Sequence, residues 1–126
     1  MTSALILFAH GARDERWAEP FRRVLARVEA AGPERAPMLA FLELMTPDLA
    51  RAIDEQAARG FTKIDIVPLF LGAGGHLSND LPKIVEAART RHSTLTIGVA
   101  TAAGEDPSVI EALADYCVHF RPSANA

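Results

Sequence analysis

Apolar residues along the chain form short continuous runs that alternate with stretches of helical spacing. A run of roughly four to eight apolar residues between polar ones is typical of a strand that is buried on both faces of a sheet. We therefore expect strands over Ala4–Ala9, Met38–Leu44, Lys63–Phe70 and Leu95–Ala100.

Between these runs, apolar residues recur at positions i, i+3, i+4 and i+7, the spacing that places side chains on one face of a helix. The first helix is expected to end near Gly32 and the second near Gly60, because glycine commonly terminates helices. The expected buried stripes are Phe21, Val24, Leu25 and Val28; Leu49, Ile53 and Ala57; Leu81, Ile84, Val85 and Ala88; and Val109, Ile110, Leu113 and Cys117.

Polar residues ahead of the later stripes indicate where those helices begin. Thr46 is expected to cap the second helix, with Pro47 at the first helical position, where proline is well tolerated. One of the residues Ser78–Asp80 is expected to cap the third helix, which places Pro82 in its first turn. Asp106 is expected to open the last helix.

The strict alternation of strand and helix predicts a parallel sheet with helices on both of its faces. Right-handed crossovers and short connections leave few topologies open for such a chain. We expect an α/β fold of the flavodoxin-like, three-layer α/β/α type, with a four-stranded parallel sheet in the order 2-1-3-4. The 126 residues suit a single domain over residues 1–126.

Composition and charge narrow the class of function. Apolar residues make up 49% of the chain, far too many for a disordered protein, and no apolar run approaches the roughly 20 residues that span a bilayer. The formal net charge is −3 and no basic stripe is visible, which argues against nucleic-acid binding. A single cysteine, Cys117, excludes an internal disulfide framework. We expect a cytoplasmic protein with no membrane segment.

Side chains that carry chemistry follow three of the predicted strands. His10 comes directly after the first strand, Glu43 lies at the end of the second, and His76 follows the third within a glycine-rich segment. In an open parallel sheet, ligands bind outside the carboxyl ends of the strands. We therefore expect these two imidazoles and this carboxylate on the same edge of the sheet.

Two histidines and one carboxylate are a familiar ligand set for an open, reactive metal site. Gly74 and Gly75, next to His76, would let a bulky flat ligand approach the backbone. Structural interpretations remain open at this point. His10 could bond a loop carbonyl, and Glu43 could cap a neighbouring helix or form an ion pair with Arg13.

Phosphate chemistry is the rival interpretation, because a glycine-rich loop that leads into a helix can bind an anion. The segment from Gly72 to Asp80 contains no Gly-Lys-Ser/Thr ending, so it is not a P-loop. His10-Gly11 is similar to the Arg-His-Gly motif of histidine phosphatases, but residue 9 is alanine. A phosphate-ester hydrolase that uses His10 is kept as a minor alternative.

Three motifs, in order and at the expected strand ends, resemble those of the CbiX-type sirohydrochlorin chelatases, and the resemblance covers nearly the whole chain. One departure is Ala12, where that family more often has serine. The motifs are Phe8-Ala9-His10-Gly11-Ala12-Arg13-Asp14, then Phe41-Leu42-Glu43-Leu44, then Val67-Pro68-Leu69-Phe70-Leu71 running into Gly74-Gly75-His76 and Asn79-Asp80.

The resemblance implies a chelatase-like domain that inserts a divalent metal into sirohydrochlorin without ATP. Cobalt, for cobalamin synthesis, is expected before iron, for siroheme, and nickel is possible. The metal is a substrate, and no organic cofactor is implied. His10 and His76 are implied as metal ligands, and Glu43 as a further ligand or a proton acceptor. The resemblance also implies a homodimer.

We further expect the macrocycle to lie over the glycine-rich segment with Gly74 and Gly75, and its carboxylate arms to meet Arg13 and the helix N-termini near Ser78 and Thr46. The same residues could serve a non-catalytic metal or tetrapyrrole carrier, and this alternative is left open by the sequence.

Overall fold

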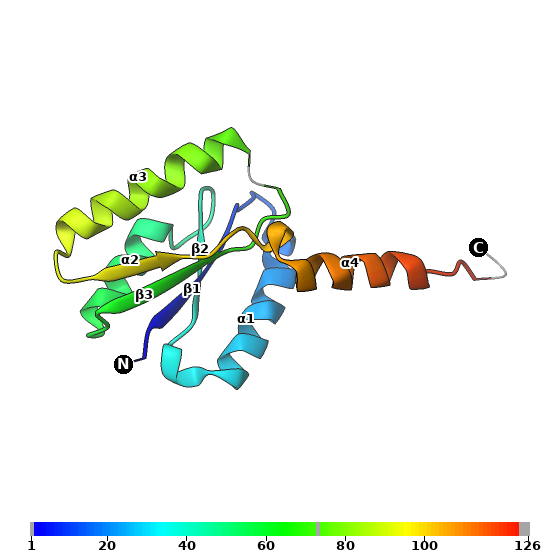
Figure 1. Cartoon of the computed structure of the whole chain (residues 1–126), viewed down its shortest axis with the longest axis horizontal. Helices are drawn as coiled ribbons and strands as arrows, with labels where there is room; N and C mark the ends of the chain where they lie inside the picture. Colours follow the sequence, from blue (N-terminus) through cyan, green and yellow to red (C-terminus); the bar gives the residue numbers. More distant parts are fainter. Residues whose placement is uncertain (1, 73, 124–126) are drawn as a thin grey trace.

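The computed structural model describes residues 2–72 and 74–123, with the side chain of His76 outside the described part, and it confirms the alternation of strands and helices (Figure 1). Short 3-10 turns lie at η1 (Glu15–Ala18), η2 (Pro33–Arg35) and η3 (Ala103–Glu105). The strands and helices are β1 (Ala4–Ala9), α1 (Glu19–Ala31), β2 (Met38–Phe41), α2 (Leu49–Ala58), β3 (Lys63–Pro68), α3 (Gly75–Arg91), β4 (Thr96–Val99) and α4 (Pro107–His119).

The strands form one parallel sheet in the order β2-β1-β3-β4, as the sequence predicts. β1 lies at the centre and pairs with β2 through Ile6 and Met38, and with β3 through Ile6 and Ile66. All six residues of β1 are buried, which explains why its sequence is a continuous apolar run. All strands therefore end at the same edge of the sheet.

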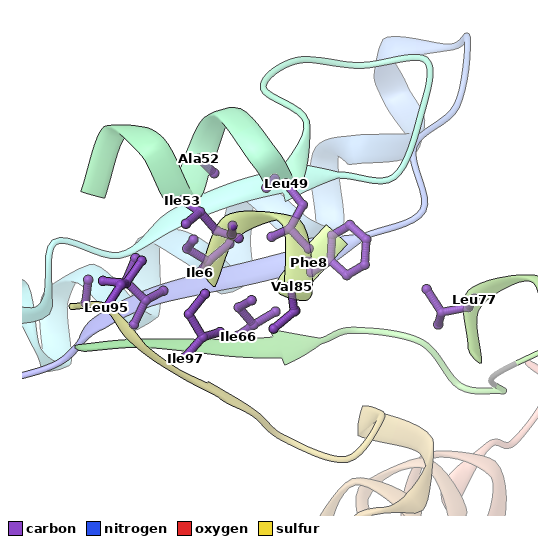
Figure 2. Close-up of a cluster of buried hydrophobic side chains, with 14 residues drawn as sticks. Ile6, Phe8, Leu49, Ala52, Ile53, Ile66, Leu77, Val85, Leu95 and Ile97 are labelled. Carbon is purple, nitrogen blue, oxygen red and sulfur yellow. The ribbon is translucent and has the colours of Figure 1, made fainter. Parts of the chain in front are cut away.

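The core lies on both faces of this sheet. Figure 2 shows the larger cluster, in which Ile6, Phe8 and Ile66 from the sheet meet Leu49 and Ile53 of α2 and Val85 of α3. α1 packs on the opposite face, where its partly buried apolar residues meet the sheet. Complete burial of one such side chain contributes about 1.5–3 kcal/mol to the hydrophobic term of folding. No helix among the described residues is long and apolar enough to cross a membrane.

Three predicted strand ends and one predicted cap are wrong. β2 ends at Phe41 rather than Leu44, β3 at Pro68 rather than Phe70, and β4 at Val99 rather than Ala100. The cap of α2 is Asp48, whose carboxylate accepts a hydrogen bond from the Arg51 backbone N–H at 2.8 Å. Helix α2 therefore begins one residue after Asp48, and Thr46 belongs to the connecting loop.

The start of α3 also differs from the prediction. The helix begins at Gly75 with Gly74 as its N-cap, so Ser78–Asp80 lie inside the helix rather than at its start. Pro82 therefore lies in the helix interior rather than in the first turn. Without a backbone N–H it cannot donate the intrahelical bond that another residue would make to the Ser78 carbonyl.

Helix α4 departs most from the sequence-based expectation. Its predicted stripe is not buried, and no residue of α4 is. Figure 1 shows the helix extending away from the sheet rather than lying on one of its faces. The outer layers described here are thus α2 and α3 on one face and α1 on the other.

An ionic link joins α2 to the end of α3. Asp54 Oδ1 lies 2.7 Å from His92 Nε2 and accepts a hydrogen bond of 3.0 Å from Arg91 Nη2. Burial alone would raise the pKa of Asp54, but the hydrogen bonds from His92 and Arg91 outweigh it and hold the pKa below its ordinary value. The ionised carboxylate is therefore the form that stabilises the fold.

We expect Asp54→Asn to lower the free energy of unfolding at pH 7 by about 0.5–1 kcal/mol, because the link is half exposed. A depressed pKa stabilises the fold above the ordinary carboxyl range, and this contribution disappears as the pH falls through the folded pKa. The difference between variant and wild type in urea unfolding should therefore shrink at pH 3. Glu55→Gln, on the exposed side of the same helix, is the control.

Candidate functional site

The loops that follow β1, β2 and β3 lie at the same end of the sheet (Figure 1). Backbone pairing continues beyond the end of β2, because the Leu42 N–H donates to the Ala9 carbonyl at 2.9 Å and the Glu43 N–H to the His10 carbonyl at 3.1 Å. These bonds hold Glu43 beside His10, although 33 positions separate the two in the sequence. The structure thus brings together two of the three predicted ligands.

The side chains of His10 and Glu43 form a direct pair. His10 Nε2 lies 3.2 Å from Glu43 Oε1, and the two side chains are 49% and 52% exposed. A carboxylate can only accept, so Nε2 carries the proton in this contact. The pair is therefore preorganised at the surface and remains accessible to a ligand from solution.

A tight backbone approach positions Glu43. Gly11 has a φ of +96°, and a Cβ on it would lie 1.9 Å from the Glu43 carbonyl oxygen. On the other side, the Met45 N–H donates to the same carbonyl at 2.8 Å and closes a three-residue turn around Leu44, whose φ is +66°. Positive φ is unfavourable for leucine, so this turn carries local strain next to the pair. The chain thus turns away from the sheet directly after Glu43.

An aromatic side chain of the core, Phe70, packs against the imidazole of His10. The ring of His10 meets Phe70 edge-on, with centroids 6.2 Å apart, and Phe70 meets the core residue Phe8 in the same manner at 5.6 Å. His10 thus has an apolar neighbour in Phe70 and an anionic neighbour in Glu43. The sequence places Phe70 in a strand and does not reveal this supporting role.

The geometry of the pair suits a shared metal ion. Bonds of about 2.0–2.2 Å, at angles of about 90–109°, place two ligand atoms about 2.8–3.6 Å apart. The separation of 3.2 Å between His10 Nε2 and Glu43 Oε1 falls in this range. Among the described residues there is no cluster of three histidine, cysteine or acidic side chains. His76 has its backbone in the first turn of α3, and its side chain lies outside the described part.

Arg13 does not pair with Glu43, which contacts His10 instead. Two of its neighbours do pair, because the Arg16 guanidinium donates hydrogen bonds to both carboxylate oxygens of Asp14. These side-chain hydrogen bonds are the main reason that the pKa of Asp14 lies below its ordinary value. Arg13 is exposed and has no hydrogen-bond or ion-pair partner in the described part of the chain. Its guanidinium is thus available to an anion.

The start of α3 presents backbone N–H groups to the surroundings. Gly74 caps the helix without a side-chain hydrogen bond, and a Cβ on Gly74 or Gly75 would meet no atom within 4 Å. Neither glycine has a positive φ, so backbone conformation alone does not require glycine there. Ser78 is exposed and directs both its N–H and its hydroxyl to the Gly74 carbonyl, at 3.1 and 3.2 Å.

A hollow of about 320 Å³ lies between the start of α3 and the end of β4. Leu77 and Ser78 form one wall, and Ala100 and Ala102 form another. It adjoins Ser78 at the same end of the sheet as His10, although His10 is not among its lining residues. A flat ligand that entered it would lie against the first turns of α3.

Comparisons with known proteins identify the relatives of this chain. A family model described as CbiX matches residues 4–118. A sirohydrochlorin cobaltochelatase from Methanopyrus kandleri is 32% identical over 82 residues, which cover 65% of this chain and 57% of that protein. A sirohydrochlorin ferrochelatase from Priestia megaterium is 23% identical over 112 residues, or 89% of this chain and 42% of that protein. The chain thus spans well under two thirds of the length of these relatives.

Solved structures show the same fold. A CbiX protein from Marinobacter aquaeolei VT8 superposes with a TM-score of 0.82 at 31% identity, over 92% of this chain and 94% of that one. SirB from Bacillus subtilis, in a structure with Fe3+, gives a TM-score of 0.80 at 23% identity, over 96% of this chain and 49% of that one. The second likeness supports the fold alone.

Proposed function

The chain belongs to the CbiX family, and we propose on that premise that it inserts a divalent metal ion into sirohydrochlorin without ATP. Cobalt is the metal that we expect first, iron second and nickel third, with the product used for cobalamin or siroheme. Relatives named cobaltochelatase and ferrochelatase support the choice of reaction. The observation that carries the proposal is the exposed His10–Glu43 pair, 3.2 Å apart at the carboxyl end of the sheet.

Metal insertion makes two chemical demands on the site. The metal must exchange protein and water ligands for four ring nitrogens, which favours weak and incomplete coordination by the protein. Two pyrrole protons must also leave, which favours a basic group near the centre of the macrocycle. We assign the metal to His10 and His76, and we assign Glu43 the role of ligand or proton acceptor. His10 would hold a metal through Nε2, with its ring proton on Nδ1 and no longer shared with Glu43.

The macrocycle carries carboxylate arms, whereas the chain has a net charge of −3, so local donors must attract it. Arg13 is an exposed guanidinium without a partner in the described part of the chain. The backbone N–H groups at the start of α3, near Gly74, Gly75 and Ser78, add the positive end of a helix dipole. We propose that these groups bind the arms while the flat ring lies over the glycines.

We expect Glu43→Gln to slow metallation by about 10²-fold, within the usual range for loss of a general base, with little change in stability. Glutamine keeps the shape of the side chain and can still hydrogen-bond the imidazole, but it carries no charge and accepts no pyrrole proton. The rate with Co2+ under saturating sirohydrochlorin measures the effect. Glu29→Gln, an exposed glutamate of α1, is the matched control. An unchanged rate would reduce Glu43 to a structural role.

The experiment that tests the function is metallation of purified sirohydrochlorin, followed by absorbance, with Co2+, Fe2+ and Ni2+ in parallel. More than one product molecule per protein chain demonstrates catalysis. A carrier would transfer at most one equivalent, and that result would overturn the enzymatic proposal. Hydrolysis of a generic phosphate ester that depends on His10 but not on metal would instead support the phosphatase alternative.

The remaining expectations from the sequence accompany this proposal. We expect one chelatase-like domain over residues 1–126, a cytoplasmic location and a homodimer. The homodimer is implied by the family resemblance alone, and light scattering on the purified chain would test it.

A further inference from the structure

Two leucines are exposed at the carboxyl end of the sheet. Leu44 is 57% exposed and Leu71 is 68% exposed. A single exposed leucine needs no explanation. These two, however, occupy corresponding positions, because each is the third residue beyond the end of its strand, after Phe41 of β2 and after Pro68 of β3.

The order of the strands places the two leucines on either side of His10. β1 lies between β2 and β3, so the loop after β1 runs between the two loops that carry Leu44 and Leu71 (Figure 1). Leu44 directly follows Glu43, whose Oε1 is 3.2 Å from His10 Nε2. Leu71 directly follows Phe70, whose ring meets the imidazole edge-on. The His10–Glu43 pair is thus flanked by an exposed apolar residue from each neighbouring loop.

Leu44 is held in an unfavourable backbone conformation. Its φ is +66°, a region that glycine adopts readily and residues with a Cβ rarely do. A side chain that is more than half exposed recovers little of this cost through packing. Leu44 also lines, together with Glu43, a hollow of about 290 Å³, so there is open space beside it. Strained residues of this kind cluster at functional sites, which points to a ligand that the leucine contacts.

Leu71 is held by a close contact between two backbones. The Gly104 N–H of η3 donates a hydrogen bond to the Phe70 carbonyl at 2.8 Å. A Cβ on Gly104 would lie 1.7 Å from the Leu71 carbonyl oxygen, so only glycine allows this approach. The backbone of Leu71 is therefore fixed against η3, although its side chain remains exposed.

We propose that Leu44 and Leu71 contact the apolar face of the macrocycle and hold its centre over the His10–Glu43 pair. A tetrapyrrole is apolar on its ring faces and charged at its rim, so the carboxylate arms remain free to meet Arg13. Contact with the two leucines removes water from the ring face, and fixed backbones reduce the entropy lost on binding. This assignment depends on the proposed function, because it names the residues that recognise the ring of that substrate.

Titration with metal-free sirohydrochlorin, followed by fluorescence, tests this contact without any metallation. Leu44→Ala and Leu71→Ala should each weaken binding about five- to tenfold, from the apolar area that each variant no longer covers. Alanine keeps a Cβ, so the cost of the positive φ at position 44 and the resistance to urea should stay as in wild type. Co2+ binding by calorimetry should also be unchanged. Val24→Ala, at an exposed apolar residue of α1, is the matched control and should bind sirohydrochlorin normally.

Leu44→Gly separates a role in binding from a role in folding. It removes the side chain and relieves the positive φ, so it should resist urea at least as well as wild type while binding sirohydrochlorin about five- to tenfold more weakly. Leu44→Met should restore the affinity. The loss should be the same at low and at high salt, because the contact is apolar, whereas the loss in Arg13→Ala should shrink at high salt.

The possible outcomes distinguish this contact from the function itself. If wild type binds and metallates sirohydrochlorin but both alanine variants bind it as tightly, the contact with the leucines is overturned and the proposed function stands. If wild type neither binds nor metallates sirohydrochlorin, both are overturned. Weaker binding together with weaker Co2+ binding or lower resistance to urea would assign the leucines to the structure of the site and would also overturn the contact.

Discussion

Replacing His10 by alanine is expected to lower the rate of metallation by at least the roughly 10–100-fold that loss of a residue supporting a metal ligand costs, because His10 is itself a proposed ligand. The change removes the imidazole whose Nε2 lies 3.2 Å from Glu43 Oε1. The site thereby loses one of the ligands that would hold the metal. The fold should survive, because the imidazole is half exposed and Phe8 and Phe70 keep their own contact beneath it. Stopped-flow absorbance with Co2+ and sirohydrochlorin measures the rate.

Two further variants make this result interpretable. His76→Ala should cause a loss of similar size if His76 is the second ligand. His119→Ala should leave the rate unchanged, because that imidazole is exposed on α4 and bonds the Asp115 carbonyl of its own helix at 2.7 Å. Calorimetric titration of Co2+ should show weaker binding by His10→Ala and by His76→Ala, and unchanged binding by His119→Ala. Near-normal metallation rates in both His10→Ala and His76→Ala would remove the two metal ligands from the proposed mechanism.

The meeting of His10 and Glu43 was predictable because it follows from topology. Strands of a parallel sheet end at one edge, so residues that directly follow apolar runs meet there however far apart they are in sequence. His10 and Glu43 satisfied this rule, and the structure places them in contact. The rule requires only that strands be recognised, and continuous apolar runs identify buried strands well.

The local geometry around Glu43 could not be predicted in the same way. The apolar run continues through Leu42 and Leu44, so hydrophobicity alone extends the strand past its real end at Phe41. Directly after Glu43 the chain turns at Leu44, which has a positive φ, and Gly11 leaves room for the Glu43 carbonyl from the neighbouring loop. A contact between two loops decides this turn, and no pattern within either segment encodes it.

The wrong predictions for the start of α3 and for the burial of α4 have different physical causes. The Ser-Asn-Asp sequence at Ser78–Asp80 is typical of a helix cap, yet α3 starts earlier, at Gly75, because the backbone there already bonds Ser78 to Gly74. In α4, the apolar spacing correctly predicts the helix but wrongly predicts that its stripe is buried. Spacing does not show where a helix points, and the contacts of Gly104 hold the preceding turn so that the helix leaves its own sheet.

Replacing Gly11 by alanine is expected to cause the largest loss of stability among the variants considered, about 3 kcal/mol or more out of the roughly 5–15 kcal/mol typical of a domain. Holding alanine at a φ of +96° costs about 1–2 kcal/mol of conformational free energy. Its Cβ would also lie 1.9 Å from the Glu43 carbonyl oxygen, so the backbone of Glu43 must move. Metallation should fall with stability, because that movement separates Glu43 from His10.

Gly60→Ala separates these two effects. Gly60 has nearly the same φ, +98°, but a Cβ there would meet no atom within 4 Å. In Gly60→Ala the free energy of unfolding should therefore fall only by the conformational cost of about 1–2 kcal/mol, and the rate of metallation should equal that of wild type. Urea unfolding and metallation rates of both variants measure the difference. If Gly11→Ala were no less stable than Gly60→Ala and equally active, the close approach of Gly11 to Glu43 would not be what holds the pair together.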